Sequence, residues 1–344
     1  MGNGCARIGI VGAGRMGRLH GANIARLVKG AELFGAADIE PGRARALARN
    51  LGTRAFPSYE AMLAERSLDA VCICTPLGGH KDSILQAIRA GKHVFTEKPL
   101  TLRPRDADLL VAAVERSGLV GAIGYMRRYD EEFELAKGKL DAGAIGTVAM
   151  IRTTSRDWGM PPIPGFGADP RASGDIAFEL STHCFDSLRW MLGCNIVEVH
   201  AWAATITTGH LAKKAGCEIM KDTIVANVRF ENGVLGSVEG CLNTSYGYDG
   251  RMEIVGEKGM LAIGTVSGAR LAMAGPDKSV TSPVPFSFPE RFREAYVKEM
   301  ADFVRCIREG GVPRATIADG AAAVKVCHAV NESIRKNRPV RVKY

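Results

Sequence analysis

The chain has few aromatic residues and no long apolar run. Phe, Trp and Tyr make up 6% of its 344 residues. A transmembrane helix needs about 18 or more consecutive apolar residues, and the sequence contains no such run, so we expect no membrane contact. The first residues also lack the basic and apolar regions of a signal peptide, and Ala6 does not fit a myristoylation motif.

Cysteine pairs with the spacing C-x-x-C are absent as well. The nine cysteines are an odd number, scattered along the chain, which favours free thiols in a reducing compartment over a disulfide framework. We therefore expect a cytoplasmic protein. The net charge of +8 comes from dispersed Lys and Arg residues without a long basic run. This pattern predicts no nucleic-acid partner and only a weak attraction for anionic ligands.

The length and the pattern of the first part predict a two-domain α/β protein. A chain of 344 residues exceeds the usual size of one hydrophobic core. In residues 1–124, stretches of helical periodicity alternate with short apolar runs at 7–11, 33–37, 70–74, 93–96 and 120–124. Such alternation indicates βαβ units and a parallel sheet. We therefore predict an N-terminal Rossmann domain with a doubly wound parallel sheet.

A different pattern begins at residue 125. Strand-like runs are separated by hairpin signals such as Asn232-Gly233, which lies between the apolar runs 224–230 and 234–238. Helical periodicity occurs at 131–142, 177–192, 290–309 and 319–336, and a Pro- and Gly-rich loop is expected at 158–174. We predict that residues 125–344 form an α+β domain with a large, mostly antiparallel open sheet and helices on one face.

A glycine-rich turn, Gly12-Ala13-Gly14-Arg15-Met16-Gly17, follows the first apolar run. This motif alone could be a plain tight turn, but its place between a strand and a helix favours a dinucleotide site. Gly12 permits the turn, Gly14 lets the backbone approach the pyrophosphate, and Gly17 lets the helix pack on the strand. The N-terminus of the helix then faces the phosphates.

Two further strand ends are expected at the cofactor. Asp38 lies 21 residues after Gly17, where a carboxylate binds ribose hydroxyls and repels a 2′-phosphate. We predict NAD rather than NADP, although Arg43 weakens this preference and Asp38 could instead cap a helix. Thr75 and Pro76 follow the apolar run 70–74, at the edge that lines the ligand crevice of an open α/β sheet. They could equally be simple strand terminators.

Lys98 follows the apolar run 93–96, in the sequence Glu97-Lys98-Pro99. A lysine beside a nicotinamide can polarise the reacting oxygen and exchange a proton with it. A lysine at a strand end is otherwise a solvated surface charge. Its predicted place at the ligand edge of the sheet favours the first interpretation and indicates a nicotinamide-dependent oxidoreductase.

The predicted helix 177–192 carries Glu179, His183, Asp186 and Trp190 at spacings of 4, 3 and 4, which would place them on one face. Glu179 is near enough to favour the protonated form of His183, as suits a general base. The pair could instead belong to a metal site, or His183 could be a structural core residue. Because no further His or Cys cluster accompanies the pair, we predict no metal.

Together these motifs resemble the Gfo/Idh/MocA oxidoreductases over nearly the whole chain. The resemblance is carried by Gly12–Gly17, Glu97-Lys98-Pro99, Gly124–Asp130, and the spacing Gly174, Glu179, His183 and Asp186. Within the family, the segments Tyr246–Asp249, Glu253–Glu257, Arg291-Phe292 and Ala295-Tyr296 are most similar to inositol 2-dehydrogenases.

The resemblance implies a Rossmann domain followed by an open α/β domain that often assembles through its sheet, so we expect a homodimer or homotetramer. It implies that His80, Glu97 and Lys98 join the cofactor site. It also implies that a polyol or sugar lies between the domains, near residues of both: Lys98, Met126, Arg127, Asp157, Glu179, His183 and Tyr248.

The predicted reaction is the reversible oxidation of a ring secondary alcohol of a cyclitol, similar to myo-inositol, to the ketone. We assign catalysis to Lys98, His183 and Glu179, and leave open which of the first two is the main proton acceptor. Glu179 replaces the Asp that inositol dehydrogenases usually have, and the extra methylene moves its carboxylate by about an ångström. A dehydrogenase of another sugar or sugar acid and a non-catalytic NAD-binding sensor are the alternatives.

Overall fold

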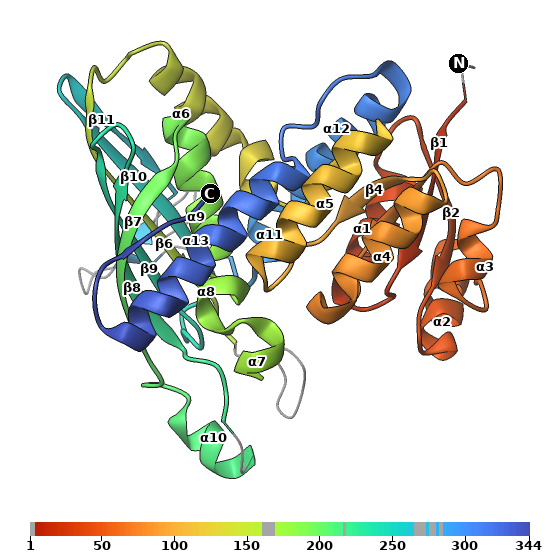
Figure 1. The fold of residues 1–344 in the computed structure, drawn as a ribbon, viewed down its shortest axis with the longest axis horizontal. Coiled ribbons are helices and arrows are strands. Elements are labelled where there is room, and N and C mark those ends of the chain that lie inside the picture. Colours follow the sequence, from red (N-terminus) through yellow and green to blue (C-terminus); the bar gives the residue numbers. More distant parts are fainter. Residues whose placement is uncertain (1–3, 160–168, 216–217, 265–272, 275–279, 282–284) are drawn as a thin grey trace. The chain divides into compact units, whose positions relative to one another are not determined.

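The computed structural model describes residues 4–159, 169–215, 218–264, 273–274, 280–281 and 285–344. Their contacts group them into two compact units (Figure 1). The first unit comprises the chain up to Tyr129 together with Glu294–Val324, and the second comprises Asp130–Arg293 together with Lys325–Tyr344. The predicted boundary between residues 124 and 125 falls near the end of the first segment. The sequence did not predict that residues 294–324 return to the first unit.

The first unit is built on a five-stranded sheet in the order β2-β1-β3-β4-β5. All neighbouring strands are parallel, which confirms the predicted Rossmann fold. The strands are β1 (Ala6–Val11), β2 (Ala31–Ala37), β3 (Ala70–Ile73), β4 (His93–Thr96) and β5 (Gly121–Ile123). The strand order reverses between β1 and β3, and ligands of open α/β sheets bind at the carboxyl ends of the strands at such a point.

The helices of the first unit follow from amphipathic sequences. They are α1 (Arg15–Arg26), α2 (Pro41–Leu51), α3 (Tyr59–Leu63), α4 (His80–Arg89), α5 (Pro104–Ser117) and α12 (Arg293–Glu309), with short 3₁₀ turns η1 (Leu77–Gly79) and η2 (Met126–Tyr129). From α12, Met300 and Phe303 are fully buried in the same core as Ile8 and Phe95. A helix from the C-terminal part of the chain therefore completes the core of the first sheet.

The second unit contains a seven-stranded sheet in the order β11-β10-β6-β9-β8-β7-β14. Its pairs are antiparallel except β6 with β9, so the predicted mostly antiparallel sheet is confirmed. The strands are β6 (Val148–Arg156), β7 (Ile196–Ala204), β8 (Thr223–Phe230), β9 (Leu235–Cys241), β10 (Asp249–Gly256), β11 (Gly259–Ile263) and β14 (Val340–Arg341). A separate pair comprises β12 (Met273–Ala274) and β13 (Val280–Thr281).

Helices pack on one face of this sheet, as α8 does on β8 and α9 on β6. The helices are α6 (Glu131–Asp141), α7 (Pro170–Ser173), α8 (Asp175–Glu179), α9 (Thr182–Leu192), α10 (Gly209–Ala215), α11 (Phe288–Arg291) and α13 (Ile317–Lys336), the last of which contributes residues to both units. In β8, buried and exposed side chains alternate, because successive side chains of a strand point to opposite faces. On the other face, described side chains such as those of Trp202 and Val225 are exposed.

The single helix predicted for residues 177–192 is wrong in one respect. The structure divides it into α8 and α9. The amides of both Leu180 and Ser181 donate to the carbonyl oxygen of Ile176, at 3.1 Å each, and a bond spanning five residues widens the turn as in a π-bulge. Glu179 therefore ends one helix and His183 lies at the start of the next. Most of the predicted loop at 158–174 lies outside the described residues, and its described end contains α7.

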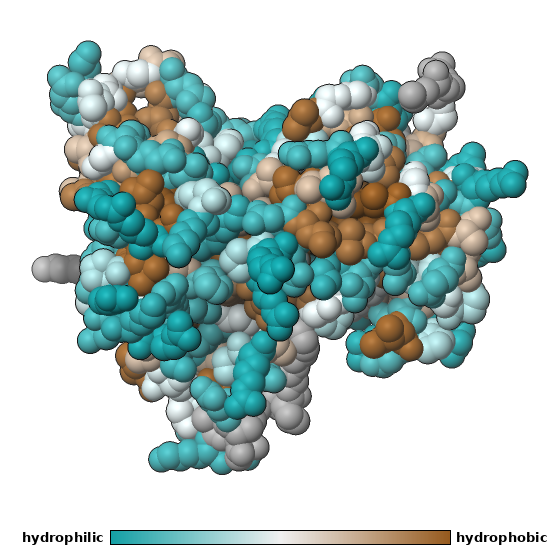
Figure 2. Space-filling view, viewed as in Figure 1, coloured by the Kyte–Doolittle hydropathy of each residue, from teal (hydrophilic) through white to brown (hydrophobic). Residues whose placement is uncertain are grey.

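Within the described ranges, no helix combines the length and apolar character needed to cross a membrane. In the view of Figure 2, hydrophilic side chains cover most of the surface and hydrophobic patches are interspersed among them.

Candidate active site

The glycine-rich loop joins β1 to α1 at the point where the strand order reverses. Gly12 has φ +90°, and a Cβ there would lie 2.7 Å from the carbonyl carbon and oxygen of Cys74. A Cβ on Gly17 would lie 1.9 Å from the carbonyl oxygen of Gly12, whereas one on Gly14 would meet no described atom within 4 Å. Two glycines are thus required by the protein's own packing, and the third leaves open space beside the loop.

This open space has the chemistry of an anion site. Gly14 is the N-cap of α1 and has no side chain to cap the helix. The N-terminus of a helix carries a partial positive charge and unsatisfied amides, which suit a phosphate group. The arrangement therefore fits the pyrophosphate of a dinucleotide.

Asp38 lies directly against the loop. Its Oδ2 accepts a hydrogen bond from the amide of Ala13 at 2.6 Å, and its Oδ1 accepts one from the amide of Glu40 at 2.8 Å. These bonds fix a carboxylate at the end of β2, beside the glycine-rich loop, where ribose hydroxyls would bind. Ile39, which the sequence analysis did not single out, is 93% exposed, and an apolar side chain next to Asp38 could pack on an adenine ring.

His80 links two of the predicted cofactor segments. It opens α4, and its ring nitrogens lie 2.9 Å from the carbonyl oxygens of Thr75 and Pro99. Burial outweighs the attraction of these two carbonyl groups for a protonated ring and lowers the pKa of His80. His80 therefore connects the end of β3 to the Glu97-Lys98-Pro99 segment through its ring. Direct contact of His80, Thr75 or Pro76 with the cofactor stays a prediction.

Glu97 is held from two sides. Its Oε1 lies 2.7 Å from Nε2 of the buried His20, and its Oε2 accepts the backbone amide of Lys98 at 3.1 Å. Burial favours the neutral acid, but the hydrogen bond with His20 and the neighbouring Lys98 lower the pKa of Glu97. Glu97 is only 7% exposed, so its carboxylate positions the backbone from which the Lys98 side chain projects.

Met126 and Arg127 lie in η2, after the last strand of the first sheet. Both side chains are buried, with 1% of their surface exposed. The guanidinium group of a buried arginine is a strong donor for hydroxyl and carboxylate oxygens. The predicted contact of these two residues with substrate stays a prediction.

In the second unit, the sheet brings Asp157 and Tyr248 together. Arg156 pairs with Asp249 in the β6–β10 register, so Asp157, one residue after β6, and Tyr248, one residue before β10, lie at the same sheet end. Tyr248 is buried against the rings of Phe288 and Phe292, whose centroids are 6.4 and 5.8 Å away.

The helix that carries His183 contacts the same strand as Asp157. Helix α9 packs on β6, and Sγ of Cys184 lies 4.0 Å from the Thr153 hydroxyl of that strand. Asp157, His183 and Tyr248 thus lie in, or directly next to, elements that contact one another. Glu179 ends the helix that precedes α9. Lys98 belongs to the first unit and His183 to the second, so their convergence stays a prediction.

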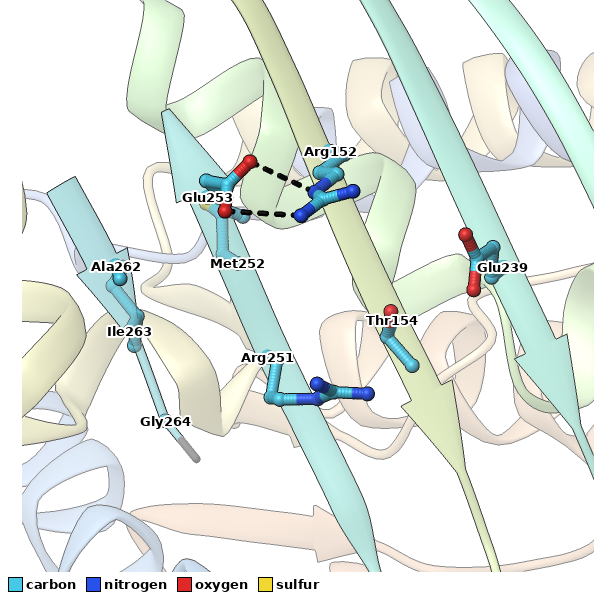
Figure 3. A pocket seen from close by; sticks show the side chains of 9 residues that line it. All are labelled: Arg152, Thr154, Glu239, Arg251, Met252, Glu253, Ala262, Ile263 and Gly264. Carbon is cyan, nitrogen blue, oxygen red and sulfur yellow. Dashed lines mark hydrogen bonds and ion pairs between the residues drawn. The ribbon is translucent and has the colours of Figure 1, made fainter. Parts of the chain in front are cut away.

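The second sheet also has a pocket on its exposed face, and this pocket is not the predicted active site (Figure 3). It lies over β6, β9, β10 and β11, and its lining includes Arg152, whose guanidinium binds both carboxylate oxygens of Glu253 at 2.9 and 3.0 Å. The described residues that line this pocket include none of the predicted site residues. The pocket therefore has no part in the predicted chemistry.

Two protein-family models match the chain. Residues 6–125 match a model described as an oxidoreductase family with an NAD-binding Rossmann fold, and residues 133–262 match the GFO/IDH/MocA C-terminal domain. The two matched segments together span most of the chain, and the first contains all of the predicted cofactor residues.

Known proteins resemble the chain over almost its whole length. It is 32% identical to scyllo-inositol 2-dehydrogenase (NAD(+)) of Bacillus subtilis, over 98% of this chain and 96% of the relative. It is 29% identical to myo-inositol 2-dehydrogenase of Thermotoga maritima, over 98% of each. The crystal structure of scyllo-inositol dehydrogenase from Lactobacillus casei with bound NAD(H) and scyllo-inositol superimposes with a TM-score of 0.88, at 31% identity, covering 98% of this chain and 99% of that one.

Proposed function

The chain belongs to the Gfo/Idh/MocA oxidoreductase family, and from this premise we propose that it is an NAD-dependent dehydrogenase of a cyclitol. It oxidises a ring secondary alcohol of an inositol-like polyol to the ketone, reversibly. The observation that carries the proposal is the meeting of two features at the carboxyl edge of the first sheet. The glycine-rich loop with Asp38 lies there, and Glu97-Lys98-Pro99 follows β4 at the same edge.

The residues of the first unit fit the cofactor. The space beside Gly14 and the N-terminus of α1 receive the pyrophosphate, with the loop Gly12–Gly17 around it. Asp38 accepts hydrogen bonds from the ribose, so that the 2′-phosphate of NADP is disfavoured. Thr75 and Pro76, at the end of β3, lie toward the nicotinamide half. When bound, NAD supplies the acceptor for the hydride that leaves the alcohol carbon.

The protein's own residues handle the proton. A ring nitrogen of His183 accepts the hydroxyl proton as the hydride departs, and Glu179 orients that ring. The Lys98 ammonium stabilises the developing alkoxide, an effect that is strongest where water is excluded. Hydroxyl groups elsewhere on the polyol are held by residues of both units: Met126, Arg127, Asp157 and Tyr248. For the reverse reaction, the same groups return the proton to the ketone oxygen.

Turnover on a panel of substrates tests this proposal. The purified protein is mixed with NAD and, in turn, with myo-inositol, scyllo-inositol, hexoses and sugar acids, and NADH formation is followed by absorbance. We expect turnover with a cyclitol and much less with the other classes, and we expect Lys98→Ala to lower the turnover by about 10²- to 10⁴-fold. Preference for a hexose or a sugar acid would contradict the substrate class. Binding of NADH without turnover on any compound would contradict the assignment as an enzyme.

We further propose that the protein is a homodimer or homotetramer that associates through the exposed face of the second sheet. Large apolar side chains are exposed there, among them Trp202 at 48% and its cross-strand neighbour Val225 at 43%. An exposed apolar face of this kind is typical of an interface. Analytical ultracentrifugation of the wild type and of Trp202→Lys tests the proposed interface, since the charge should shift the protein toward monomer.

A cytoplasmic location is also part of the proposal. It is supported by the described cysteines, which are all free thiols.

A further inference from the structure

A cluster of ionisable side chains is buried in the first unit, next to the Glu97-Lys98-Pro99 segment. It brings together His20 from α1, Glu97 from the end of β4 and Glu299 from α12. Potential ligand atoms of all three lie within 4.8 Å of one another. His20 is 0%, Glu299 1% and Glu97 7% exposed, so none of them exchanges freely with water. Two carboxyl groups and an imidazole thus share one dry site.

The hydrogen bonds in this cluster are distributed unevenly. Glu97 uses both oxygens, one toward Nε2 of His20 and one for the amide of Lys98. By contrast, Nδ1 of His20 and both oxygens of Glu299 have no hydrogen-bond partner among the described residues. A buried polar group without a partner is costly and calls for an explanation.

Protonation of Glu299 supplies that explanation. Two adjacent carboxyl groups do not both ionise in a dry site, and Glu97 is the one whose charge is stabilised. Burial, together with the charge of Glu97 and the presence of Cys74, raises the pKa of Glu299 well above its usual value. A protonated Glu299 is a hydrogen-bond donor, and Nδ1 of His20, which has no partner either, is an acceptor whenever Nε2 carries the ring proton.

We propose that Glu299, as a neutral carboxylic acid, and His20 are positioning residues for Lys98. The acid proton of Glu299 is directed at Nδ1 of His20, Nε2–H of His20 donates to Glu97, and the Glu97 carboxylate accepts the backbone amide of Lys98. The significance for catalysis rests on the proposed function, because Lys98 is there the residue that stabilises the alkoxide. The contacts of Glu97 with His20 and with the Lys98 amide are present in the structure, and the bond from Glu299 to His20 is the proposed link. With this link the chain extends from α12 to the strand end that carries Lys98.

The titratable groups of Cys72 and Tyr129 beside the cluster are neutral, so Glu97 is the residue that carries the negative charge. Burial and the nearby thiol of Cys74 raise the pKa of Cys72, and burial and Asp302 raise the pKa of Tyr129. Both groups are therefore neutral. The titratable groups that face Glu299 are His20 on α1, Cys72 on β3 with Cys74 just after it, Glu97 after β4, and Tyr129 in η2.

The unfolding of the cofactor-free protein tests the protonation of Glu299. In the unfolded chain Glu299 ionises near its ordinary value of 4.5, whereas the folded protein keeps the proton. The folded state then binds more protons, so the wild type loses stability through Glu299 as pH rises above 4.5. Glu299→Gln cannot lose a proton. We therefore expect its melting temperature to rise relative to wild type with increasing pH. Glu294→Gln, an exposed change on the same helix, should show no such trend.

Enzyme kinetics test the positioning. Gln at position 299 keeps a donor for His20, whereas Leu has nearly the same size and no donor. We expect kcat of Glu299→Leu to fall roughly tenfold to a hundredfold below that of Glu299→Gln, with a smaller change in KM for the polyol. The affinity for NADH, measured by its fluorescence, should also be lower in Glu299→Leu than in Glu299→Gln. Glu294→Gln should match the wild type in both measurements.

Three results would overturn the proposal. One is an equal pH dependence of unfolding in Glu299→Gln and wild type. Another is equal kcat and NADH affinity in the Leu and Gln variants. The third is stoichiometric zinc in the wild type that is lost in Glu299→Gln, because a metal ligand would be ionised. If the wild type oxidises no polyol, the proposed function fails, while unfolding and NADH affinity still decide on Glu299.

Discussion

Alanine substitutions at two glycines of the cofactor loop should distinguish a glycine that the fold requires from one that cofactor binding requires. Gly12→Ala places a Cβ 2.7 Å from the carbonyl carbon and oxygen of Cys74 and 2.8 Å from the amide nitrogen of Thr75, on a backbone with φ +90°. All of these are main-chain atoms, so no flexible side chain can move aside. Gly14→Ala has an ordinary φ of −71°, and its Cβ meets no described atom within 4 Å.

The expected magnitudes differ accordingly. A left-handed conformation costs an L-residue roughly 1–2 kcal/mol, and overpacking adds about 1–3 kcal/mol. We therefore expect Gly12→Ala to lower the free energy of unfolding by about 2–5 kcal/mol. Gly14→Ala should leave it unchanged or raise it by about 0.4–1 kcal/mol, because alanine restricts the unfolded chain. The methyl group at Gly14 enters the space for the pyrophosphate, so NADH should bind about tenfold more weakly, which is roughly 1.4 kcal/mol.

Two assays on the same preparations measure these effects. Thermal unfolding without cofactor reports stability, and titration with NADH by fluorescence reports affinity. We predict that Gly12→Ala unfolds at a lower temperature than the wild type, whereas Gly14→Ala unfolds like the wild type and binds NADH weakly. Wild-type affinity of Gly14→Ala for NADH, or the same unfolding temperature for both variants, would refute this prediction.

Three further predictions concern single side chains. Lys98→Ala and His183→Ala should each lower kcat by about 10²- to 10⁴-fold in steady-state assays, and near-wild-type turnover in both would reject their roles. Asp38→Ser should raise the ratio of kcat/KM for NADP to that for NAD by roughly tenfold, because a 2′-phosphate is no longer repelled; an unchanged ratio would show that Asp38 does not face the ribose. Asp222 accepts bonds from the amides of Ile206, Thr207 and Thr208, and against burial these and the neighbouring hydroxyls lower its pKa to about 2. Asp222→Ala should therefore lower the free energy of unfolding at neutral pH by about 1–3 kcal/mol. Its deficit should shrink as pH falls from 3.8 toward 2; a deficit independent of pH in denaturant titrations would contradict this.

The first sheet was readable from the sequence because its strands are buried on both faces. Such strands are continuous apolar runs, and the five predicted runs correspond to β1–β5. Most of the helix predicted at 290–309 is present as α12, although the structure separates it from α11 at Phe292. Periodicity shows which face of a helix is apolar but not which core it covers. The burial of Met300 and Phe303 with the first sheet therefore required the structure.

Some of the candidate site could be predicted, because Gly12 and Asp38 act through the local geometry of a strand end. The partners of Glu97 could not, because His20 and Glu299 are 77 and 202 residues away in sequence. A signal for His20 was nevertheless present. It occupies the inner face of α1 with Gly17 and Ile24, and a histidine at a core position of an amphipathic helix predicts a buried polar partner. The break between α8 and α9 had no such signal, since residues 177–192 keep helical periodicity throughout.

In the proposed mechanism, Lys98 and His183 act on the same hydroxyl group. A crystal structure of the protein with NADH and a cyclitol measures this directly. We predict that Nζ of Lys98 and a ring nitrogen of His183 both lie about 2.6–3.2 Å from the oxygen of one hydroxyl group of the cyclitol, and that the ring carbon bearing this hydroxyl faces the nicotinamide. A complex in which either side chain points away from that oxygen, toward solvent, would contradict the account.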